Sequence, residues 1–434
     1  MNQKTPTVIV AAAIVMSTAM AQAQGARPVE LTLDEAVARA LANHPAIEAA
    51  AHGVSAAEAR ALQAGLWPNP GLEIEVENFG GDGDLRGFQS GETTALVNQV
   101  LPIGGTPGRR RAVADAEHAV AGRDLESTRL DVVARATAAF STVLAAQQRE
   151  DLAIKLLEVA EDFARIVQAK VDSGKVSPVE STRAQIEVAQ AGVRRARAAR
   201  ELRAARARLA ASWGSPVADF DRAVGSLPRP EFSPPFDGLR SMLAATPDIG
   251  RLDDLVERQR RVVALEKSLR IPDLAVGIGP RRFEETGQSA WVAGVGVSIP
   301  IFDRRQGARR AAEFDLERMH RDADTARLAL ETELAVVCER LNAAVEAAHS
   351  AEDEVVPSAM SALAAVKIGY REGKFAFVDV IAAQRAFFEA GTLLLDSLEE
   401  YAIARAELDR LVGRPFDSGD APTTENADTH GDGR

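Results

Sequence analysis

The feature that most constrains the fold of this chain is an internal duplication. The segment VDSGKVSPVESTRAQIEVAQA at 171–191 matches YREGKFAFVDVIAAQRAFFEA at 370–390, at an offset of 199 residues. Further upstream, LPIGGTPGRRRAVADAE at 101–117 parallels IPIFDRRQGARRAAEFDLE at 299–317 at nearly the same offset. Matches that recur in the same order predict two copies of one supersecondary unit within the 434 residues.

Both copies have the same expected order of elements. This order is a helix (about 32–66 and 236–270), two strands (about 71–79 with 93–101, then 273–279 with 290–299), a long helical stretch (about 108–172 and 305–371), a Gly-Lys turn and a final helix (about 177–212 and 376–412). We therefore place the first repeat at 31–225 and the second at 237–413. The segment 226–236 is proline-rich, as expected of a linker, and 414–434 has the polar composition of a disordered tail.

The N-terminus has the features of a secretory signal. Lys4 precedes an apolar run from Val8 to Met16, and two A-x-A cleavage sites follow. Residues 1–23 are therefore predicted to be a signal peptide, with cleavage after Ala21 or Ala23 left open. The single cysteine is Cys338, so no cysteine near the cleavage region could carry a lipid anchor and no internal disulfide can form. We expect an exported protein that is not lipidated.

The long helical stretches predict an elongated fold. A helix of about 65 residues would be about 100 Å long at 1.5 Å per residue, which is too long for a compact globule. Apolar residues recur at spacings of three and four, as in a coiled coil. Aromatic residues make up only 5% of the chain, which favours closely packed helices. The expected fold is mainly α with a small β part, in which the helices form a coiled-coil rod or the wall of a helical tube.

The strands alternate between two kinds of side chain. In the strand at 71–79, Leu72, Ile74 and Val76 point to one face and Glu73, Glu75 and Glu77 to the other. This alternation is typical of an outer-membrane barrel, although a soluble, half-buried sheet would show it too, and the strands alone leave both open. Four strands cannot enclose a channel. In a membrane several chains would have to share one barrel, and three chains would supply twelve strands.

The sequence contains no pattern that predicts an enzyme. The six histidines have no tight ligand spacing: His44, His52, His118, His320, His349 and His430. The GxSxG, Walker A and dinucleotide-binding motifs do not occur. We therefore expect no catalytic residue, no cofactor and no metal site within one chain. The basic run at 193–209 is interpreted as a solvated helix face rather than a nucleic-acid site, because its apolar residues form a seam and the net charge of the chain is −12.

With these features the sequence resembles the TolC-like outer-membrane efflux family over residues 31–413. The signal peptide, the duplicated layout and the two turn segments carry this resemblance. Within it, LWPNP at 66–70, LPIGGTPGRRRA at 101–112 and IPIFDRRQGARRAAE at 299–313 are similar to the branch that exports heavy-metal cations such as cobalt, zinc and cadmium. The resemblance implies a homotrimer with a twelve-strand barrel in the outer membrane and a helical tunnel in the periplasm. It further implies a periplasmic adaptor and a proton-driven inner-membrane RND pump as partners.

The resemblance also implies a gate at the periplasmic tip, around Gly174 and Gly373. By position, Asp379 corresponds to the family's constriction acid and Tyr370 to a tyrosine of the gate network, while Glu180 is the acid that matches Asp379 in the first repeat.

Two positions depart from the family pattern. A second constriction acid is replaced by Ala382, and the tip arginine by Phe375. A double acidic ring is therefore not expected, and the closed state must be held differently.

The expected function is a passive exit duct in the outer membrane, in which three copies of Glu73, Glu75 and Glu77 make an acidic barrel lumen that attracts cations. Two alternatives stay open: a TolC-like duct for drugs or type I secreted polypeptides, and, more distantly, a soluble periplasmic coiled-coil adaptor. The sequence does not decide the exported substrate, the identity of the pump and adaptor, or the resting state of the gate.

Overall fold

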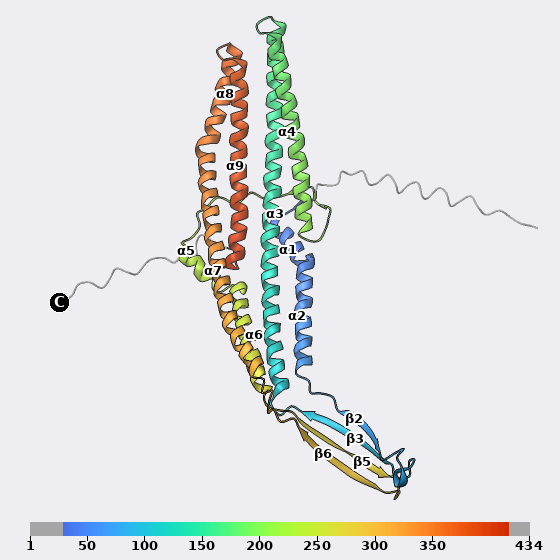
Figure 1. Cartoon of the computed structure of the whole chain (residues 1–434). Coiled ribbons are helices and arrows are strands. Elements are labelled where there is room, and N and C mark those ends of the chain that lie inside the picture. The colour runs from blue at the N-terminus through green and yellow to red at the C-terminus, as the bar shows by residue number, and fades with distance from the viewer. Residues whose placement is uncertain (1–28, 416–434) are drawn as a thin grey trace, which may run out of the picture. The chain divides into compact units, whose positions relative to one another are not determined.

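The computed structural model describes residues 29–415 in two compact units (Figure 1). The predicted signal peptide and all but the first two residues of the predicted tail lie outside the described residues. Among those described, unit 1 consists of 29–42, 136–229 and 350–399, and unit 2 consists of 43–135, 230–349 and 400–415. Each unit contains segments of both repeats, so the compact units do not coincide with the sequence repeats.

The described chain is mainly helical, with one four-stranded sheet. The elements are β1 (Glu30–Leu31), α1 (Leu33–Asn43), α2 (Pro45–Ala64), β2 (Gly71–Glu77), a 3-10 turn (Gly83–Leu85), β3 (Glu92–Leu101), α3 (Thr106–Asp172), α4 (Pro178–Ala211), β4 (Arg222–Ala223), α5 (Phe236–Leu243), α6 (Pro247–Ser268), β5 (Leu274–Phe283), β6 (Ser289–Val297), α7 (Gln306–Ser350), a π-helix (Ala351–Val355), α8 (Val356–Glu372) and α9 (Phe377–Val412). The predicted fold class, mainly α with a small β part and a tandem duplication, is confirmed. Within residues 29–415, no helix is long and apolar enough to cross a membrane.

Two predicted helices are interrupted, and the prediction of continuous helices was wrong there. The stretch at 32–66 breaks at His44, whose Nδ1 accepts a hydrogen bond of 3.1 Å from the Ala46 N–H and so caps α2. The stretch at 236–270 breaks at Thr246. In each case a proline follows the break. Proline cannot continue a helix from the preceding turn but fits the first turn of a new one.

The long helical stretch of the second repeat also differs from its prediction. In the first repeat, α3 runs for 67 residues without a break. In the second, a π-helix of 5 residues separates α7 from α8, and Pro357 lies at the start of α8. A proline lacks the N–H that an α-helix interior requires, and the π turn lies directly before the turn that contains Pro357.

Unit 1 contains two helical hairpins that lie side by side, α3 with α4 and α8 with α9 (Figure 1). Helix α4 contributes an alanine at every seventh position, Ala184, Ala191, Ala198 and Ala205, and all four are buried. This heptad spacing is that of a coiled-coil seam, and alanine lets the neighbouring helices approach closely. The arginines of 193–209 lie off this seam.

Two very short strands were not predicted. β1 pairs in parallel with β4, and Leu31 in β1 is fully buried. The side chain of Gln147 in α3 binds both backbone groups of Ala223, donating to its carbonyl at 3.0 Å and accepting from its N–H at 2.9 Å. Strands of two residues show no alternation in the sequence, so this pair could not be recognised from it.

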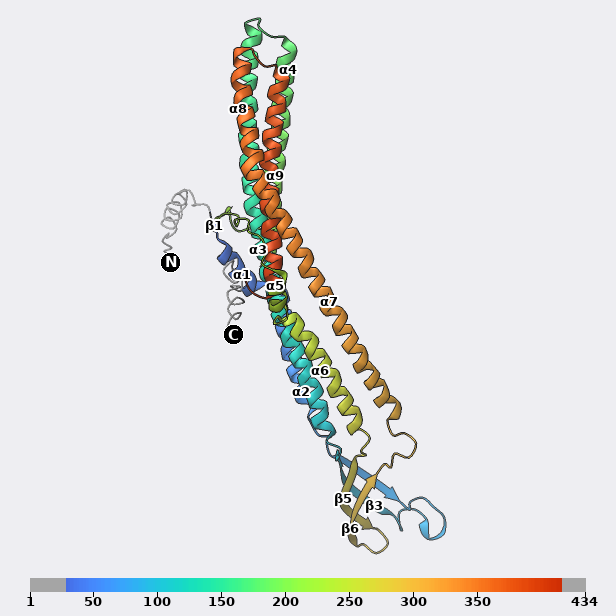
Figure 2. The same cartoon turned by 90° about the vertical axis from the view of Figure 1, so that its left-hand side faces the viewer.

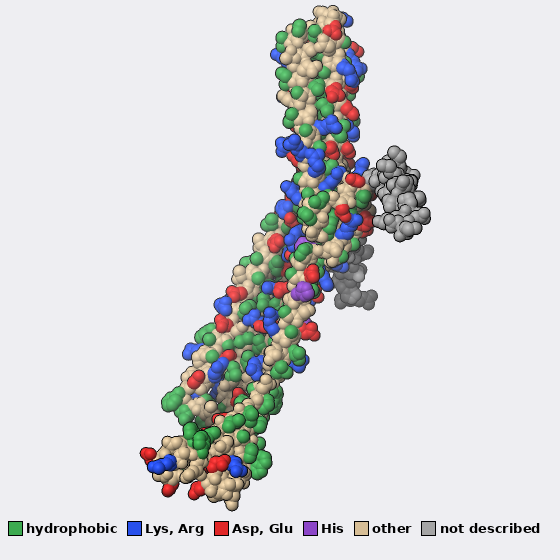
Figure 3. All heavy atoms as spheres, turned by 90° about the vertical axis from the view of Figure 1, so that its right-hand side faces the viewer, with side chains coloured by type: hydrophobic (Ala, Val, Ile, Leu, Met, Phe, Trp, Pro, Cys, Tyr) green, Lys and Arg blue, Asp and Glu red, His purple; other side chains and the backbone are tan. Residues whose placement is uncertain are grey.

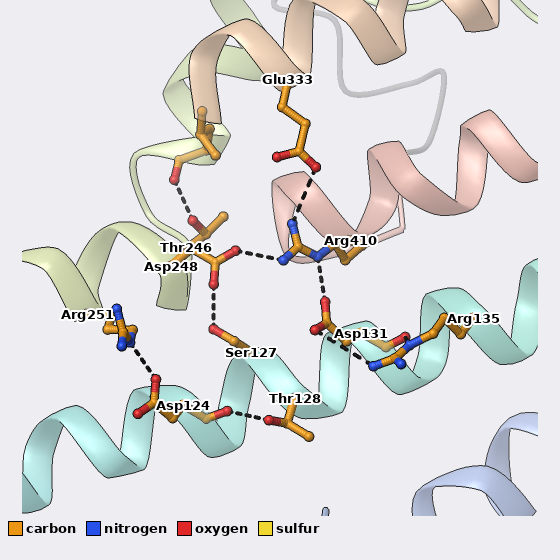
Figure 4. Close-up of polar contacts among 11 residues, drawn as sticks. Asp124, Ser127, Thr128, Asp131, Arg135, Thr246, Asp248, Arg251, Glu333 and Arg410 are labelled. Atoms are coloured by element: carbon orange, nitrogen blue, oxygen red, sulfur yellow. Dashed lines mark hydrogen bonds and ion pairs between the residues drawn. The ribbon is translucent and has the colours of Figure 1, made fainter. Parts of the chain in front are cut away.

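Unit 2 has an apolar core and, beside it, a partly buried charge network (Figure 4). The Arg410 guanidinium of α9 pairs with Asp131 of α3 at 2.6 Å, Asp248 of α6 at 3.4 Å and Glu333 of α7 at 4.0 Å. Asp248 also accepts a hydrogen bond of 2.6 Å from Ser127. Burial lowers the pKa of Arg410, but the surrounding carboxylates raise it by more, so the group stays charged. One side chain thereby joins four helices of this unit.

The sheet of unit 2 has the order β2-β3-β5-β6, with all neighbours antiparallel (Figure 2). The β3–β5 pairing joins the hairpins of the two repeats. On one face the apolar side chains are exposed, including Leu72 at 71%, Trp291 at 76% and Val295 at 74%. Hydrophobic side chains gather in the strand region of the space-filling view (Figure 3). A large exposed apolar surface on a sheet indicates contact with a partner or a membrane.

Two glycines of β5 explain how β3 and β5 can approach. A Cβ at Gly279 would lie 1.7 Å from the Ala95 carbonyl oxygen, and one at Gly277 would lie 2.2 Å from the Asn98 Oδ1. A larger side chain at 279 would displace the backbone of β3, whereas one at 277 would displace only the Asn98 side chain. Glycine at 279 is therefore required by the close approach of the two repeats.

Candidate functional site

The helix turns at the end of unit 1 are built alike in both repeats. Gly174 and Gly373 adopt left-handed backbone conformations, with φ of 69° and 80°. The N–H of the following lysine reaches back to the carbonyl five residues earlier, from Lys175 to Lys170 at 2.9 Å and from Lys374 to Gly369 at 2.8 Å. This is the arrangement in which glycine ends a helix. The chain therefore reverses in the same way at both tips.

The two acids that follow these turns have different partners, although both occupy the third position of their helix. In α4, Ser177 caps the helix by accepting from the Val179 N–H at 3.3 Å, and the Glu180 carboxylate accepts from the Tyr370 hydroxyl. In α9 the equivalent residue is Ala376, which has no capping oxygen. Asp379 Oδ2 accepts from the Ala376 N–H instead, at 2.9 Å. Two acids at the same helix position thus have different partners: Asp379 binds the start of its own helix, and Glu180 binds the Tyr370 hydroxyl.

Tyr370 brings the two hairpins of unit 1 together. Its hydroxyl donates to Glu180 Oε2 at 3.1 Å, and its ring lies 5.9 Å from that of Phe377 and 6.3 Å from that of Phe163. Lys170 places its ammonium 4.1 Å from the ring centroid and donates to the Tyr370 carbonyl. The side chain is 3% exposed. Burial first, and the Glu180 carboxylate second, raise the pKa of Tyr370 to about 12.

The position where the family pattern expects an arginine has a packing role in this chain. Phe375 lies against Gly369, where an added Cβ would be 2.2 Å from the Phe375 Cδ2 atom. Glycine at 369 therefore makes room for the aromatic ring at the turn. Among the predicted gate residues, Tyr370 and Glu180 are brought into contact, while Asp379 binds its own helix start.

The second candidate region is the charged face of the sheet. The register places Glu73, Glu75 and Glu77 on one face, as predicted, together with Glu92 and Thr94 of β3. Glu73 Oε2 accepts from the Asn98 side-chain amide at 2.7 Å. The role of these glutamates as a channel lumen stays a prediction.

Arg281 is the residue of this face that the sequence analysis missed. Its Nη2 lies 3.0 Å from Glu77 Oε2, its Nη1 lies 2.9 Å from Glu92 Oε2, and its Nε donates to Thr94 Oγ1 at 2.8 Å. The predicted strand ended at residue 279, whereas β5 extends to Phe283. The only signal was the period of two, which, continued for one more step, would have put Arg281 on the charged face.

The described part of the chain contains no group of three His, Cys, Asp or Glu side chains that could hold a metal ion. His44 instead caps a helix, and Cys338 is buried in the core of unit 2. Burial raises the pKa of the Cys338 thiol. The chemistry available at both candidate regions is therefore that of fixed charges and hydrogen bonds.

The tip geometry predicts a pH-dependent loss of stability. The folded protein favours the protonated Tyr370 phenol, so this contribution is present below pH 10 and is lost as the pH rises toward about 12. We expect Tyr370→Phe to lower the unfolding free energy by about 1 kcal/mol at pH 8. Above pH 10, the unfolding free energy of this variant should decline less than that of the wild type. Circular dichroism melts at several pH values measure both.

The matched control is Tyr401→Phe. Tyr401 is the other tyrosine of the chain, and its hydroxyl accepts a hydrogen bond from Arg405. The unfolding free energy of this variant should decline between pH 10 and 12 as much as that of the wild type. An equal decline in Tyr370→Phe and in the wild type would contradict the assignment of that pH dependence to Tyr370.

Comparison with known proteins gives consistent matches over most of the chain. The chain is 31% identical over 384 residues to the cobalt-zinc-cadmium resistance protein CzcC of Cupriavidus metallidurans, which covers 88% of this chain and 90% of the relative. It is 29% identical over 343 residues to the nickel-cobalt-cadmium resistance protein NccC of Alcaligenes xylosoxydans, covering 76% and 75%.

Solved structures share the fold. The channel-forming membrane protein CusC matches with a TM-score of 0.77 at 16% identity, covering 88% of this chain and 92% of that chain. The outer membrane protein VceC of Vibrio cholerae matches with a TM-score of 0.74 at 17% identity, covering 89% and 97%.

The sequence model of the outer membrane efflux protein family matches residues 36–215 and 239–414, one match in each half of the chain. This assignment confirms the predicted resemblance and decides against the soluble periplasmic adaptor. The chain belongs to the outer membrane efflux protein family.

Proposed function

We propose that this chain is the exit duct of a tripartite, proton-driven efflux system that exports heavy-metal cations such as cobalt, zinc or cadmium. The observation that carries the duct is the sheet, which has one exposed apolar face, one charged face and an unpaired edge on both β2 and β6. The likeness to a cobalt-zinc-cadmium resistance protein over 88% of the chain supports the substrate.

The duct requires more than one copy of the chain. An open edge facing lipid leaves backbone N–H and C=O groups without partners, which costs several kcal/mol per group. Pairing β6 of one copy with β2 of the next would satisfy both edges, and a homotrimer would close a barrel of twelve strands, which is wide enough for a channel. The apolar faces would then contact outer-membrane lipid and the glutamates would line the lumen.

The helices supply the periplasmic part and its gate. We propose that the Tyr370–Glu180 hydrogen bond holds the two hairpins of unit 1 together in a closed tip, and that Gly174 and Gly373 shape the two turns. Three copies of Asp379 would place like charges near the narrow end. A periplasmic adaptor and an inner-membrane RND pump would provide the driving force, so the chain itself would conduct passively, without enzymatic chemistry or a cofactor.

Export to the outer membrane would depend on residues 1–23. This segment has the order of charge, apolar run and small residues that signal peptidase recognises. We propose that the mature protein carries no lipid anchor, because Cys338 is its single cysteine.

The Asp379 carboxylate is expected to favour cations at the gate. Asp379→Asn keeps an oxygen that can accept from the Ala376 N–H but removes the charge, so it separates the two roles. We expect it to lower the potassium-to-chloride permeability ratio roughly twofold or more in planar bilayers. Asp379→Ala, which also removes the cap, should lower that ratio similarly and in addition lower the melting temperature. An unchanged ratio in Asp379→Asn would mean that the acid acts only as a helix cap.

The metal assignment predicts a growth phenotype. Deleting the gene should sensitise cells to zinc, cobalt or cadmium in growth assays on graded concentrations. Changing any single histidine to alanine should leave resistance intact, because a conducted ion needs weak and replaceable contacts rather than one tight site.

Two outcomes would overturn parts of this proposal. A deletion strain that tolerates these metals but becomes sensitive to dyes or detergents would favour the duct for drugs, and a loss of polypeptide secretion would favour the type I role. A single histidine variant that abolishes resistance at normal expression would contradict passive conduction.

A further inference from the structure

We propose that Arg281 sets the ion selectivity of the sheet region by compensating part of the negative charge of the carboxylates at its loop end. The attraction for cations is then strongest at the level of Glu73 and Glu75. This inference rests on the proposed function, because it requires the charged face to line a conducting lumen.

The contacts of Arg281 are specific. The guanidinium binds Glu77 at 3.0 Å, Glu92 at 2.9 Å and the Thr94 hydroxyl at 2.8 Å, and the Arg281 side chain is 26% exposed. Thr94 is 1% exposed, so its hydroxyl is a buried, fixed acceptor for the guanidinium. Asn78 donates a further hydrogen bond of 3.3 Å to Glu92. One cation thus holds two carboxylates from two different strands, in a geometry that charge-assisted hydrogen bonds stabilise.

The register shows that these groups share one face of the sheet. Thr94 is opposite Glu75 on one side and opposite Arg281 on the other, and Arg281 is opposite Ala290 of β6. By the alternation of side chains, the remaining β5 and β6 residues of this face are small or apolar. They are Ala275, Gly277, Gly279, Phe283, Ala290, Val292, Gly294 and Gly296. Within the described strands, this face therefore carries four carboxylates, all on β2 and β3, and a single guanidinium.

The charge is unevenly distributed along the strands. Glu77 and Glu92 share the positive charge of Arg281 at the loop end. Glu73 accepts a hydrogen bond from a neutral amide, so its charge is not compensated. Glu73 and Glu75 are two residues apart, about 7 Å along the strand. A cation would therefore be attracted more strongly at the level of Glu73 and Glu75 than at the loop end of the strands.

Arg281→Gln should make the channel more selective for cations. Removing one unit charge per chain from a water-filled lumen should raise the potassium-to-chloride permeability ratio roughly two- to fivefold. The ratio is obtained from reversal potentials of the full-length purified protein in planar bilayers under a KCl gradient. Arg281→Lys keeps the charge and should leave the ratio close to that of the wild type.

The neighbouring residue offers a matched control. Arg282 carries the same charge but lies opposite Thr93 and Ser289, on the apolar face, where it pairs with Glu284 at 3.1 Å. Arg282→Gln should leave the permeability ratio unchanged. An equal shift in both glutamine variants, or no shift in Arg281→Gln, would overturn the inference.

A second variant covers the case in which Arg281→Gln does not fold. Glu77→Gln removes one negative charge beside Arg281 and leaves Glu92 to balance the guanidinium, so it should lower the permeability ratio, in the direction opposite to Arg281→Gln. An unchanged ratio in Glu77→Gln also contradicts the inference. If the wild-type protein itself forms no channel, the proposed function fails, whereas normal channels with unaltered selectivity in these variants refute the role of Arg281 alone.

Discussion

The unpaired backbone at the two edges of the sheet is the constraint on which the rest of the proposed assembly depends. β2 and β6 have one neighbour each within the chain. An exposed edge is a template for another strand, and in a bilayer an unpaired edge is not tolerated. The apolar face of the sheet also needs a partner or a membrane to cover it, because side chains such as Trp291 and Val295 are three-quarters exposed in one chain. The single chain is therefore incomplete in a way that identical copies can correct.

Duplication supplies the scaffold, and the two copies have diverged in their side chains. The turns at Gly174 and Gly373 are equivalent, yet Glu180 binds Tyr370 whereas Asp379 binds the start of its own helix. The helices that lead to these turns differ as well, since α3 is continuous and its counterpart contains a π-helix. The two repeats also differ on the charged face of the sheet, because the acids lie on the strands of the first repeat and Arg281 lies on a strand of the second. The two repeats share a backbone plan but not their side-chain chemistry.

Much of the fold could be predicted from the sequence because its signals are local and periodic. The strand alternation around Glu75, the apolar seam of α4 and the Gly-Lys turns each follow from short-range patterns. The breaks at His44 and Thr246 were missed although a proline marks both.

The remaining features depend on contacts between distant segments, which one sequence does not reveal. The β1–β4 pair, the Arg410–Asp131 ion pair and the β3–β5 junction join residues more than one hundred positions apart. The contacts of the candidate sites were hidden for the same reason. Tyr370 and Glu180 could be named from the sequence, but the hydrogen bond between them joins residues 190 positions apart in the chain. Arg281 lay beyond the predicted end of its strand.

The central claim is that copies of this chain complete one another's sheet, and the mass of the detergent-extracted protein tests it most directly. Light scattering coupled to size-exclusion chromatography, corrected for bound detergent, should report three chains per particle with the β signal retained. A stable monomer that keeps its full β content would show that the sheet edges need no partner, and would contradict the shared barrel.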